Sequence, residues 1–371
     1  MKLERALVRN FKGVREIEID FSSSSGAAPR QLTALLGDNG SGKTTVLQAI
    51  ALTLSMATGR TRMPDEFNWM GFNAERLSTL GDTHVELDVR FDANEIALVE
   101  ALFPDWYAAH PLDWRESPRS LFRVVTPARN ERVKLLYDGG RLSSPQGDES
   151  INQFRGRYYV EYLSRTQPAR RELLPKLGDV FWFQQERNLS SAVADRGGEA
   201  NERPWEYEGW LAGVEHLRKS LVELWAYHTS SNQSYGRDYI VLLEEQFARV
   251  FPGTRFSGVA PRGGTCASTL GGSYVFLERD GKVYDIAEMS SGEQAVFSLA
   301  YEFVRLDIAK SVVLIDELEL HLHPPQQQAL LGALRKLGED CQFIITTHSP
   351  FLEDVIPREE EVRLLGGRGC L

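Results

Sequence analysis

The chain has 371 residues, of which 42% are hydrophobic, and its 42 Lys and Arg stand against 52 Asp and Glu, which gives a formal net charge of −10. This composition excludes a disordered chain, and the acidic excess excludes binding to nucleic acid through net charge alone. Three cysteines without a CxxC pair, no apolar run of about 18 residues and a charged first segment predict a cytoplasmic protein with no disulfide framework, membrane span or signal peptide.

Apolar periodicity predicts the strands and helices of the first half of the chain. A strand at 32–36 is followed at once by a Gly-rich turn and then by a helix over 44–56. From about residue 59 to 176 the pattern changes, and this part is predicted to be an inserted, mixed α/β lobe. Further strands are predicted at 3–8, 14–21, 85–91 and 132–137.

The second half is predicted to begin with helices and to end in regular α/β structure. A hairpin at 274–286 turns at Asp280-Gly281, a dipeptide typical of two-residue hairpin loops. The last strands alternate with helices, which predicts a parallel sheet with right-handed crossovers. The predicted helices lie at 208–228, 239–250, 293–308 and 325–337, and the predicted strands at 312–315 and 342–346.

The segment GDNGSGKT, from Gly37 to Thr44, matches the phosphate-loop pattern G-x-x-x-x-G-K-[ST] and lies between a predicted strand and a predicted helix. Its glycines let backbone N–H groups face a phosphate, Lys43 supplies a charge to the β- and γ-phosphates, and the Thr44 hydroxyl is placed to bind Mg²⁺. The pattern therefore predicts that the chain binds ATP and Mg²⁺. The predicted nucleotide-binding residues of the loop are Asn39, Gly40, Ser41, Gly42, Lys43, Thr44 and Thr45.

Two carboxylates, Asp316 and Glu317, follow the apolar run VVLI. The carboxyl ends of parallel strands meet at one edge of a sheet, so Asp316 is expected to reach the Mg²⁺ near the phosphate loop. Glu317 is expected to orient or deprotonate the water that attacks the γ-phosphate. Two acids after a strand are usually only solvated, but the phosphate loop upstream favours the catalytic interpretation.

His348 follows another predicted strand, in the run IITTHSP. A lone histidine is more often structural than catalytic, but the end of a strand at the same sheet edge favours a contact with the γ-phosphate. We therefore predict Lys43, Glu317 and His348 as the catalytic residues.

The run MSSGEQ, which begins at Met289, directly precedes an apolar-periodic helix and is a second candidate anion site. Ser290 or Ser291 is a candidate N-cap there, and an ordinary N-cap without a ligand is the alternative. With NFKGVREIEIDF, GDNGSGKTT, LIDELELHLHP and TTHSP in this order, the motif set resembles the ABC-type ATPases of the branch that contains RecF, the SMC proteins and the overcoming-lysogenisation-defect (OLD) family. The resemblance covers about the first 60 and the last 90 residues.

The resemblance implies a site that a second copy of the chain completes. In that family the signature of one protomer closes over the γ-phosphate bound by the other, so the signature would act in trans in a homodimer or a higher oligomer. A glutamine at the end of a strand would bind Mg²⁺, and both Gln184 and Gln185 fit after the run VFWF, with surface amides as the alternative. The signature residues assigned to nucleotide binding are Ser290, Ser291, Gly292 and Glu293.

The resemblance also implies an α/β fold, an ABC-type ATPase head with a phosphate loop and a parallel or mixed sheet, plus an inserted α/β and helical lobe. The chain between the motifs is too short and aperiodic for long coiled-coil arms, and with 23 residues after His348 the nuclease domain of OLD proteins is not expected. The predicted domains are the N-terminal half of the head (1–60), the inserted lobe (61–176), the glutamine-loop and helical lobe (177–280) and the C-terminal half of the head (281–371).

Two positions depart from the common pattern of the family. Ser291 stands where many members have a second signature glycine, and His323 stands where an aspartate is common. OLD-like and related phage-defence ATPases resemble the chain in the second region. His321 and His323 with Glu319 suggest a metal site, but structural or dimer-interface imidazoles are favoured because only one carboxylate is near.

The segment from Asp105 to Lys176 is locally basic, and several of its arginines alternate with aromatic residues. Such a mixture binds phosphates and stacks bases, but a solvated lobe or a protein interface is an equal alternative. The arginines predicted to contact nucleic acid are Arg155, Arg157, Arg170 and Arg171.

The motifs favour an ATPase that dimerises on ATP and controls a separate effector, such as a nuclease or a toxin, in anti-phage defence. A RecF-like protein that uses ATP to clamp DNA during repair is the first alternative. A scaffold that ATP stabilises with little turnover is the second. No membrane partner is predicted.

Overall fold

The computed structural model describes residues 1–23, 26, 28–110, 124–183, 214–230, 237–261, 273–320 and 322–364. The chain divides into two compact units: unit 1 contains Met1–Gln184, Ala309–Leu318 and Glu339–Leu371, and unit 2 contains Gln185–Ile308 and Glu319–Gly338. Among the described residues, no helix is both long and apolar enough to cross a membrane.

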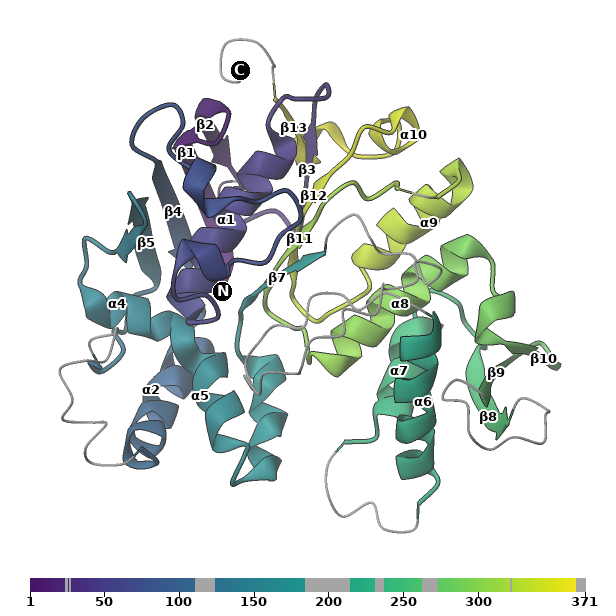
Figure 1. The fold of residues 1–371 in the computed structure, drawn as a ribbon. Helices are drawn as coiled ribbons and strands as arrows, with labels where there is room; N and C mark the ends of the chain where they lie inside the picture. Colours follow the sequence, from purple (N-terminus) through teal and green to yellow (C-terminus); the bar gives the residue numbers. More distant parts are fainter. Residues whose placement is uncertain are drawn as a thin grey trace. The chain divides into compact units, whose positions relative to one another are not determined.

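Unit 1 contains a five-stranded parallel sheet with the strand order β13-β3-β12-β11-β7 (Figure 1). Every residue of four of these strands, β3, β7, β11 and β12, is buried, as expected for strands that are covered on both faces. This sheet confirms the predicted α/β class. The strands are β3 (Leu32–Leu36), β7 (Val180–Phe183), β11 (Val312–Ile315), β12 (Gln342–Thr346) and β13 (Glu361–Arg363).

A second sheet of unit 1 is antiparallel and has the order β2-β1-β4-β5-β6. Buried and part-exposed residues alternate along β4, which is the pattern of a strand with one face on the core. Strands that precede residue 60 in the chain share this sheet with strands that follow it. The division of the chain into four domains stays a prediction. The strands are β1 (Lys2–Phe11), β2 (Val14–Asp20), β4 (His84–Arg90), β5 (Arg132–Asp138) and β6 (Arg141–Ser143).

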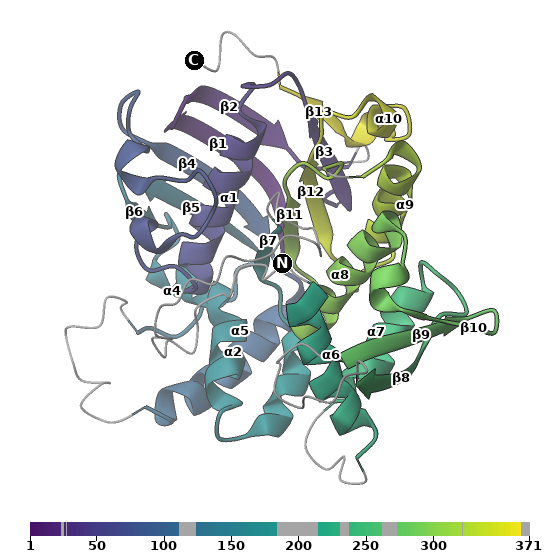
Figure 2. The ribbon, with the colours of Figure 1, turned by 45° about the vertical axis from the view of Figure 1, so that its right-hand side comes forward.

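Helix α1 (Lys43–Thr58) forms the centre of unit 1 because it contacts both sheets: β1, β4 and β5 on one side and β7 and β12 on the other (Figures 1 and 2). Every residue from Val46 to Thr58 is buried. A helix that is covered on all sides is apolar around its whole circumference, and this sequence has that character. The helix ends at Gly59, whose φ of 82° is the left-handed C-cap conformation that glycine favours.

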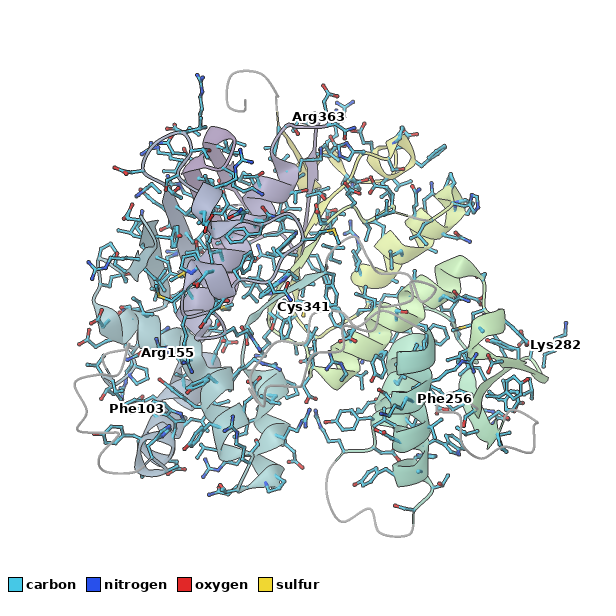
Figure 3. The ribbon with its side chains drawn as sticks, viewed as in Figure 1. Phe103, Arg155, Phe256, Lys282, Cys341 and Arg363 are labelled. Carbon is cyan, nitrogen blue, oxygen red and sulfur yellow. The ribbon has the colours of Figure 1, made fainter. Side chains whose placement is uncertain are left out.

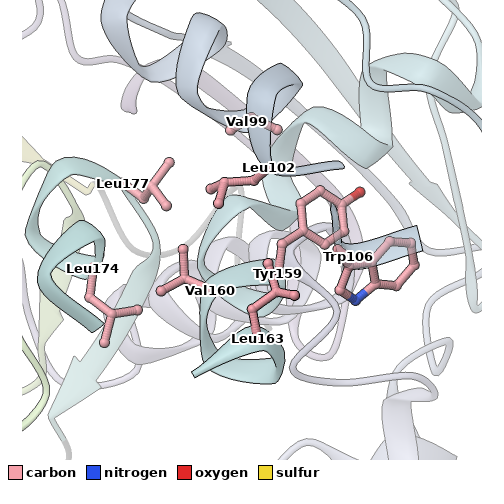
Figure 4. Packing of buried hydrophobic residues seen from close by; sticks show 8 residues of the cluster. All are labelled: Val99, Leu102, Trp106, Tyr159, Val160, Leu163, Leu174 and Leu177. Carbon is pink, nitrogen blue, oxygen red and sulfur yellow. The ribbon is translucent and has the colours of Figure 1, made fainter. Parts of the chain in front are cut away.

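Two further helices of unit 1 pack against each other. Helices α2 (Ala93–Ala108) and α5 (Gly156–Leu163) pack together through a cluster that includes Trp106 and Tyr159 (Figure 4). The other short helices of unit 1 are α4 (Asp148–Asn152) and α10 (Pro350–Glu353).

Unit 2 combines helices with a three-stranded antiparallel sheet of order β10-β9-β8. Arg218 donates to Asp285, and Asp285 also accepts from the backbone N–H of Val275 at 3.0 Å, so this buried ion pair links a helix to the sheet. The elements are α6 (Val214–His228), α7 (Tyr239–Ala248), β8 (Arg255–Pro261), β9 (Ser273–Arg279), β10 (Lys282–Asp285), α8 (Ser291–Arg305) and α9 (Pro324–Leu334).

The predicted strands and helices are confirmed where the structure describes them, with shifts at their ends. The helix predicted over 293–308 begins earlier, because Ser290 caps it, and ends at Arg305, before Asp307 takes a left-handed φ of 50°. Residues 208–213 of another predicted helix lie outside the described residues. The elements that the sequence patterns do not predict include α2, α5, β8 and β13.

Candidate active site

The phosphate loop joins β3 to α1 in a conformation that requires glycine. Gly40 and Gly42 have φ values of 80° and 91°, which side chains other than hydrogen rarely allow. A Cβ atom on Gly37 would lie 2.5 Å from the carbonyl oxygen of Leu364, so no larger residue fits there. The loop therefore turns tightly into the start of α1, where N–H groups suit an anion.

Lys43, the first residue of α1, is held against the loop. Its ammonium donates to the carbonyl oxygens of Gly37 at 2.7 Å and Asp38 at 3.0 Å. The same Nζ lies 3.3 Å from His348 Nδ1. Because an ammonium group only donates, Nδ1 must accept, and the ring proton is then on Nε2. The site thus presents one cation and one imidazole donor side by side.

Asp316 is 1% exposed and accepts two hydroxyl hydrogen bonds. Thr44 Oγ1 donates to its carboxylate at 2.9 Å, and Thr346 Oγ1 donates at 2.7 Å. A carboxylate beside a hydroxyl is the hard oxygen donor set that Mg²⁺ prefers, so Thr44 and Asp316 fit this ion. The other two predicted Mg²⁺ ligands, Gln184 and Gln185, lie outside the described residues.

Glu317 has a φ of 48°, which is rare for a residue with a side chain and costs about 1–2 kcal/mol. Its backbone N–H donates to Thr346 Oγ1 at 2.8 Å, which holds this conformation. Glu317 lines a pocket of about 220 Å³ together with Lys43 and His348. A strained residue at the wall of a pocket supports a functional position, because strain persists where the surroundings enforce it.

The pocket brings together most of the residues that the phosphate-loop pattern predicts. Besides Lys43, Glu317 and His348, the predicted residues that line it are Asn39, Gly40, Gly42, Thr44 and Thr45. Ser41 is predicted as well and is buried within the loop. The roles of all these residues in binding or catalysis stay predictions.

Two pocket residues and two supporting residues are missing from the sequence-based prediction. Gly13 and Val14, at the turn between β1 and β2, line the pocket. Lys12 anchors this turn to α1 by donating to Gln48 Oε1 at 2.9 Å. Thr346 supports both acidic residues through its hydroxyl. A threonine at the end of a predicted strand beside His348 is a signal that could have indicated it.

The signature residues lie in unit 2, at the start of α8. Ser290 Oγ accepts from the backbone N–H of Glu293, and the Glu293 carboxylate accepts from the backbone N–H of Ser290 at 3.0 Å, which is a capping box. Arg279 donates to the same carboxylate at 2.7 Å. Burial opposes the charge of Glu293, but the bonds from Ser290 and Arg279 outweigh it and hold the pKa of Glu293 below its ordinary value.

The signature glycine packs tightly against the neighbouring helix of the same unit. A Cβ atom on Gly292 would lie 2.6 Å from Gln326 Cγ in α9. Gln326 Oε1 also accepts from the backbone N–H of His323 at 2.9 Å, so the start of α9 is fixed beside the signature. Within the described residues, no three His, Cys, Asp or Glu side chains form a metal site; His321, one of the suggested ligands, lies outside them.

The predicted nucleic-acid contact of Arg157 is wrong. This side chain is only 3% exposed, so it cannot lie along a nucleic-acid backbone. Arg155 is 6% exposed and does not form part of an open basic surface, although it lines a pocket. Arg157 lies 3.7 Å from Asp179 and over the ring of Phe181, which makes it part of the core. The alternation of arginine with aromatic residues reflects packing inside the lobe. Arg170 is half-buried and bonds Asp105 at 2.6 Å, and Arg171 is exposed.

A phosphate loop between β3 and α1, with an aspartate after the parallel strand β11, is the arrangement of a P-loop nucleotide-binding domain. The chain belongs to the family described as "AAA domain, putative AbiEii toxin, Type IV TA system", which matches residues 32–354. The motif resemblance to the branch that contains the OLD family is confirmed by relatives that include an OLD nuclease.

The chain is 24% identical to the OLD nuclease of Thermus scotoductus, over 98% of this chain and 62% of that protein. It is 22% identical to the "Retron Vc95 probable ATPase" of Vibrio cholerae, over 92% and 70%. It is 24% identical to the Septu protein PtuA of Bacillus mycoides, over 98% and 40%. The chain therefore spans less than two thirds of the OLD nuclease and of PtuA. Among solved structures, an SMC head bound to the C-winged helix domain of ScpA aligns with 98% of this chain and 97% of that chain, at 15% identity and a TM-score of 0.45.

Proposed function

We propose that this chain is an ATPase that closes as a two-fold dimer over ATP and thereby controls a separate effector in anti-phage defence. The observation that carries the proposal is the convergence of Lys43, Glu317 and His348 on one pocket. These side chains come from the start of α1 and from the ends of two parallel strands. Such an edge, beside a phosphate loop, is where α/β proteins bind nucleotides.

The pocket has the groups that transfer of a phosphoryl group to water needs. Lys43 would bind the β- and γ-phosphates, and the Nε2–H of His348 would donate to the γ-phosphate. Glu317 would accept a proton from the water whose oxygen attacks the γ-phosphorus, while the bond to the β-phosphate oxygen breaks and ADP leaves. When held by Thr44 and Asp316, Mg²⁺ would neutralise charge on the phosphates.

The dimeric part of the proposal rests on the signature. The 15-residue helix α8 begins at Ser291 with a complete capping box, and the start of such a helix favours an anion. In the ATP-bound dimer, Ser290 and Gly292 of one protomer would contact the γ-phosphate bound by its partner. Hydrolysis would remove that contact and release the two copies.

The role in defence rests on the relatives. An OLD nuclease, a retron ATPase and a Septu protein represent ATPases of phage-defence families. This similarity favours an effector such as a nuclease or a toxin over a role in DNA repair. The burial of Arg157 removes one of the four arginines on which the DNA-clamp alternative depends, and Arg155 does not form part of an open basic surface.

Phosphate release by the isolated protein tests the enzymatic part of the proposal. Glu317→Gln is expected to lower turnover at least about a hundredfold, because it removes the proposed general base, and to leave ATP binding intact. Glu339→Gln is the matched control, since Glu339 is an exposed carboxylate of the same unit. Undiminished turnover in Glu317→Gln would contradict the assignment, and negligible turnover by the unmodified chain would favour the ATP-stabilised scaffold.

A further inference from the structure

A second pocket of unit 1, of about 380 Å³, has no part in the proposed ATPase reaction. It lies at the end of α1 that is opposite the phosphate loop: Met56, in the last turn of α1, lines it, whereas Lys43 begins the helix. Lys43 and Met56 lie 13 residues apart along α1, which separates the two sites by about 20 Å. The second pocket is therefore distinct from the proposed ATP site.

Positive side chains dominate the charge of this second pocket. Among the described residues that line it, Arg62, Arg141 and Arg155 stand against one acidic residue, Asp148. Arg62 and Arg141 are exposed and come from different segments of unit 1. Within the described parts of the chain, Arg141 forms no ion pair. Converging guanidinium groups from separate segments are typical of a site for phosphate.

Arg155, which is labelled in Figure 3, is a charged residue that lines this pocket. The residue is only 6% exposed. Its Nε lies against the end of α1, at 3.8 Å from where a Cβ on Gly59 would stand, and the negative end of the helix dipole stabilises a cation there. Burial still lowers the pKa of Arg155, and nearby Tyr159, Tyr158 and Asp148 offset this only in part.

The remaining lining suits an organic group rather than an inorganic ion alone. Met56, Met63, Leu142 and Ile151 provide apolar surface for a flat ring, and Met63 is 50% exposed. The Asp148 carboxylate can accept hydrogen bonds from sugar hydroxyls. The volume lies near the lower end of the range of about 300–1,000 Å³ that small-molecule sites span, which suits one nucleotide rather than a dinucleotide.

We propose that this second pocket binds a nucleoside monophosphate, with its phosphate between the three arginines and its base on the methionines. Two kinds of ligand contain a nucleoside monophosphate: a free mononucleotide and the 5′-terminal nucleotide of a nucleic-acid strand. The proposal is independent of ATP hydrolysis, because the two pockets share none of the described residues that line them.

Calorimetric titration with AMP tests the proposal on the full chain. The Arg62→Ala/Arg141→Ala variant is expected to bind AMP at least about tenfold more weakly, because it loses two charge-assisted contacts. Both residues are exposed, so the variant is expected to fold. Arg132→Ala, which removes an exposed arginine of β5 outside the pocket, and Lys43→Ala, which alters the phosphate loop, are both expected to keep the unmodified affinity within about twofold.

Inorganic phosphate and adenosine are each expected to bind more weakly than AMP. Equal affinity for AMP in the double variant, loss of AMP binding in Lys43→Ala, or no binding of AMP by the unmodified chain would overturn the proposal. A 5′-phosphorylated pentanucleotide distinguishes these two kinds of ligand. Tighter binding of this probe than of AMP, lost in the double variant, would assign the pocket to strand ends, and weaker binding would assign it to the free nucleotide.

Discussion

Lys43 and Ser290 both stand at the start of a helix, but the partners of these two helix starts differ. At α1, the neighbouring Thr44 bonds Asp316, which is more than 270 residues away, and Lys43 contacts His348 at the end of another strand. At α8, Ser290 bonds Glu293 within the same turn. The tertiary fold builds the first site, and the local sequence builds the second.

This difference indicates what each region can do alone. A pocket whose walls come from four separate segments of one unit is suited to bind ATP within one chain. A capped helix start presents N–H groups to an anion, and in the proposed dimer the partner would bring that anion. Variants in the two regions should therefore separate ATP binding from turnover.

Lys43→Ala should have the largest effect on ATP binding. It removes the ammonium that the loop carbonyls hold in place, and with it charge-assisted contacts to two phosphates, so the affinity should fall at least about a hundredfold. Lys176→Ala, at an exposed lysine of the same unit, is the control. Titration with a fluorescent ATP analogue measures the affinity. Ser290→Ala should leave it within about threefold; equal losses in Lys43→Ala and Ser290→Ala would remove the distinction between the two regions.

Gly292→Val should destabilise unit 2. The new Cβ would meet Cγ and Cβ of Gln326 at 2.6 and 2.8 Å, and such overpacking costs about 1–3 kcal/mol of the free energy of unfolding. Gly332→Ala in α9 is the matched control, because a Cβ at that position meets no atom within 4 Å and helix propensity favours alanine by about 1 kcal/mol. Urea unfolding compares the two variants; a Gly292→Val protein as stable as the control would show that α8 and α9 can separate at no cost.

Glu293→Gln should have the smallest effect, and that effect should depend on pH. The folded-state pKa of Glu293 is lowered, so its charge stabilises the fold above the unfolded pKa of about 4.3, and this contribution disappears as pH falls through the lower folded pKa. The variant should be less stable than the unmodified chain by about 0.3–1 kcal/mol at pH 7 and equally stable at strongly acidic pH. Glu245→Gln, at an exposed residue of α7, should show no such trend. A stability difference that is constant with pH would contradict the capping role.

The sequence predicted the candidate site well where local pattern and chemistry coincide. The phosphate loop, Asp316, Glu317 and His348 each follow a strand of recognisable apolar character, and the parallel sheet brings these strand ends together. Gly13 and Val14 were not predicted as site residues, because a turn between two strands has no sequence signature of nucleotide binding. Only the fold places that turn beside the phosphate loop.

The middle of the chain was less predictable for a physical reason. Arg155 and Arg157 have the composition of a surface patch, yet Arg157 stacks on Phe181 and Arg155 lies against the end of α1. A sequence pattern does not distinguish a charged side chain at the surface from one that is buried with compensation. Strand β13, which pairs with β3, was not predicted either, because a strand of three residues is too short to show a periodic pattern in the sequence.

The most direct test of the central proposal, that the signature of one chain completes the ATP site of another, is a mixing experiment. Each variant alone is expected to release no phosphate. Lys43→Ala would not bind ATP, and Ser290→Leu would not close the dimer over it. In an equimolar mixture, heterodimers contain one site with an intact phosphate loop and an intact signature from the partner. Phosphate release should therefore recover to about a quarter of the unmodified rate. A mixture no more active than either variant alone would contradict completion of the site in trans.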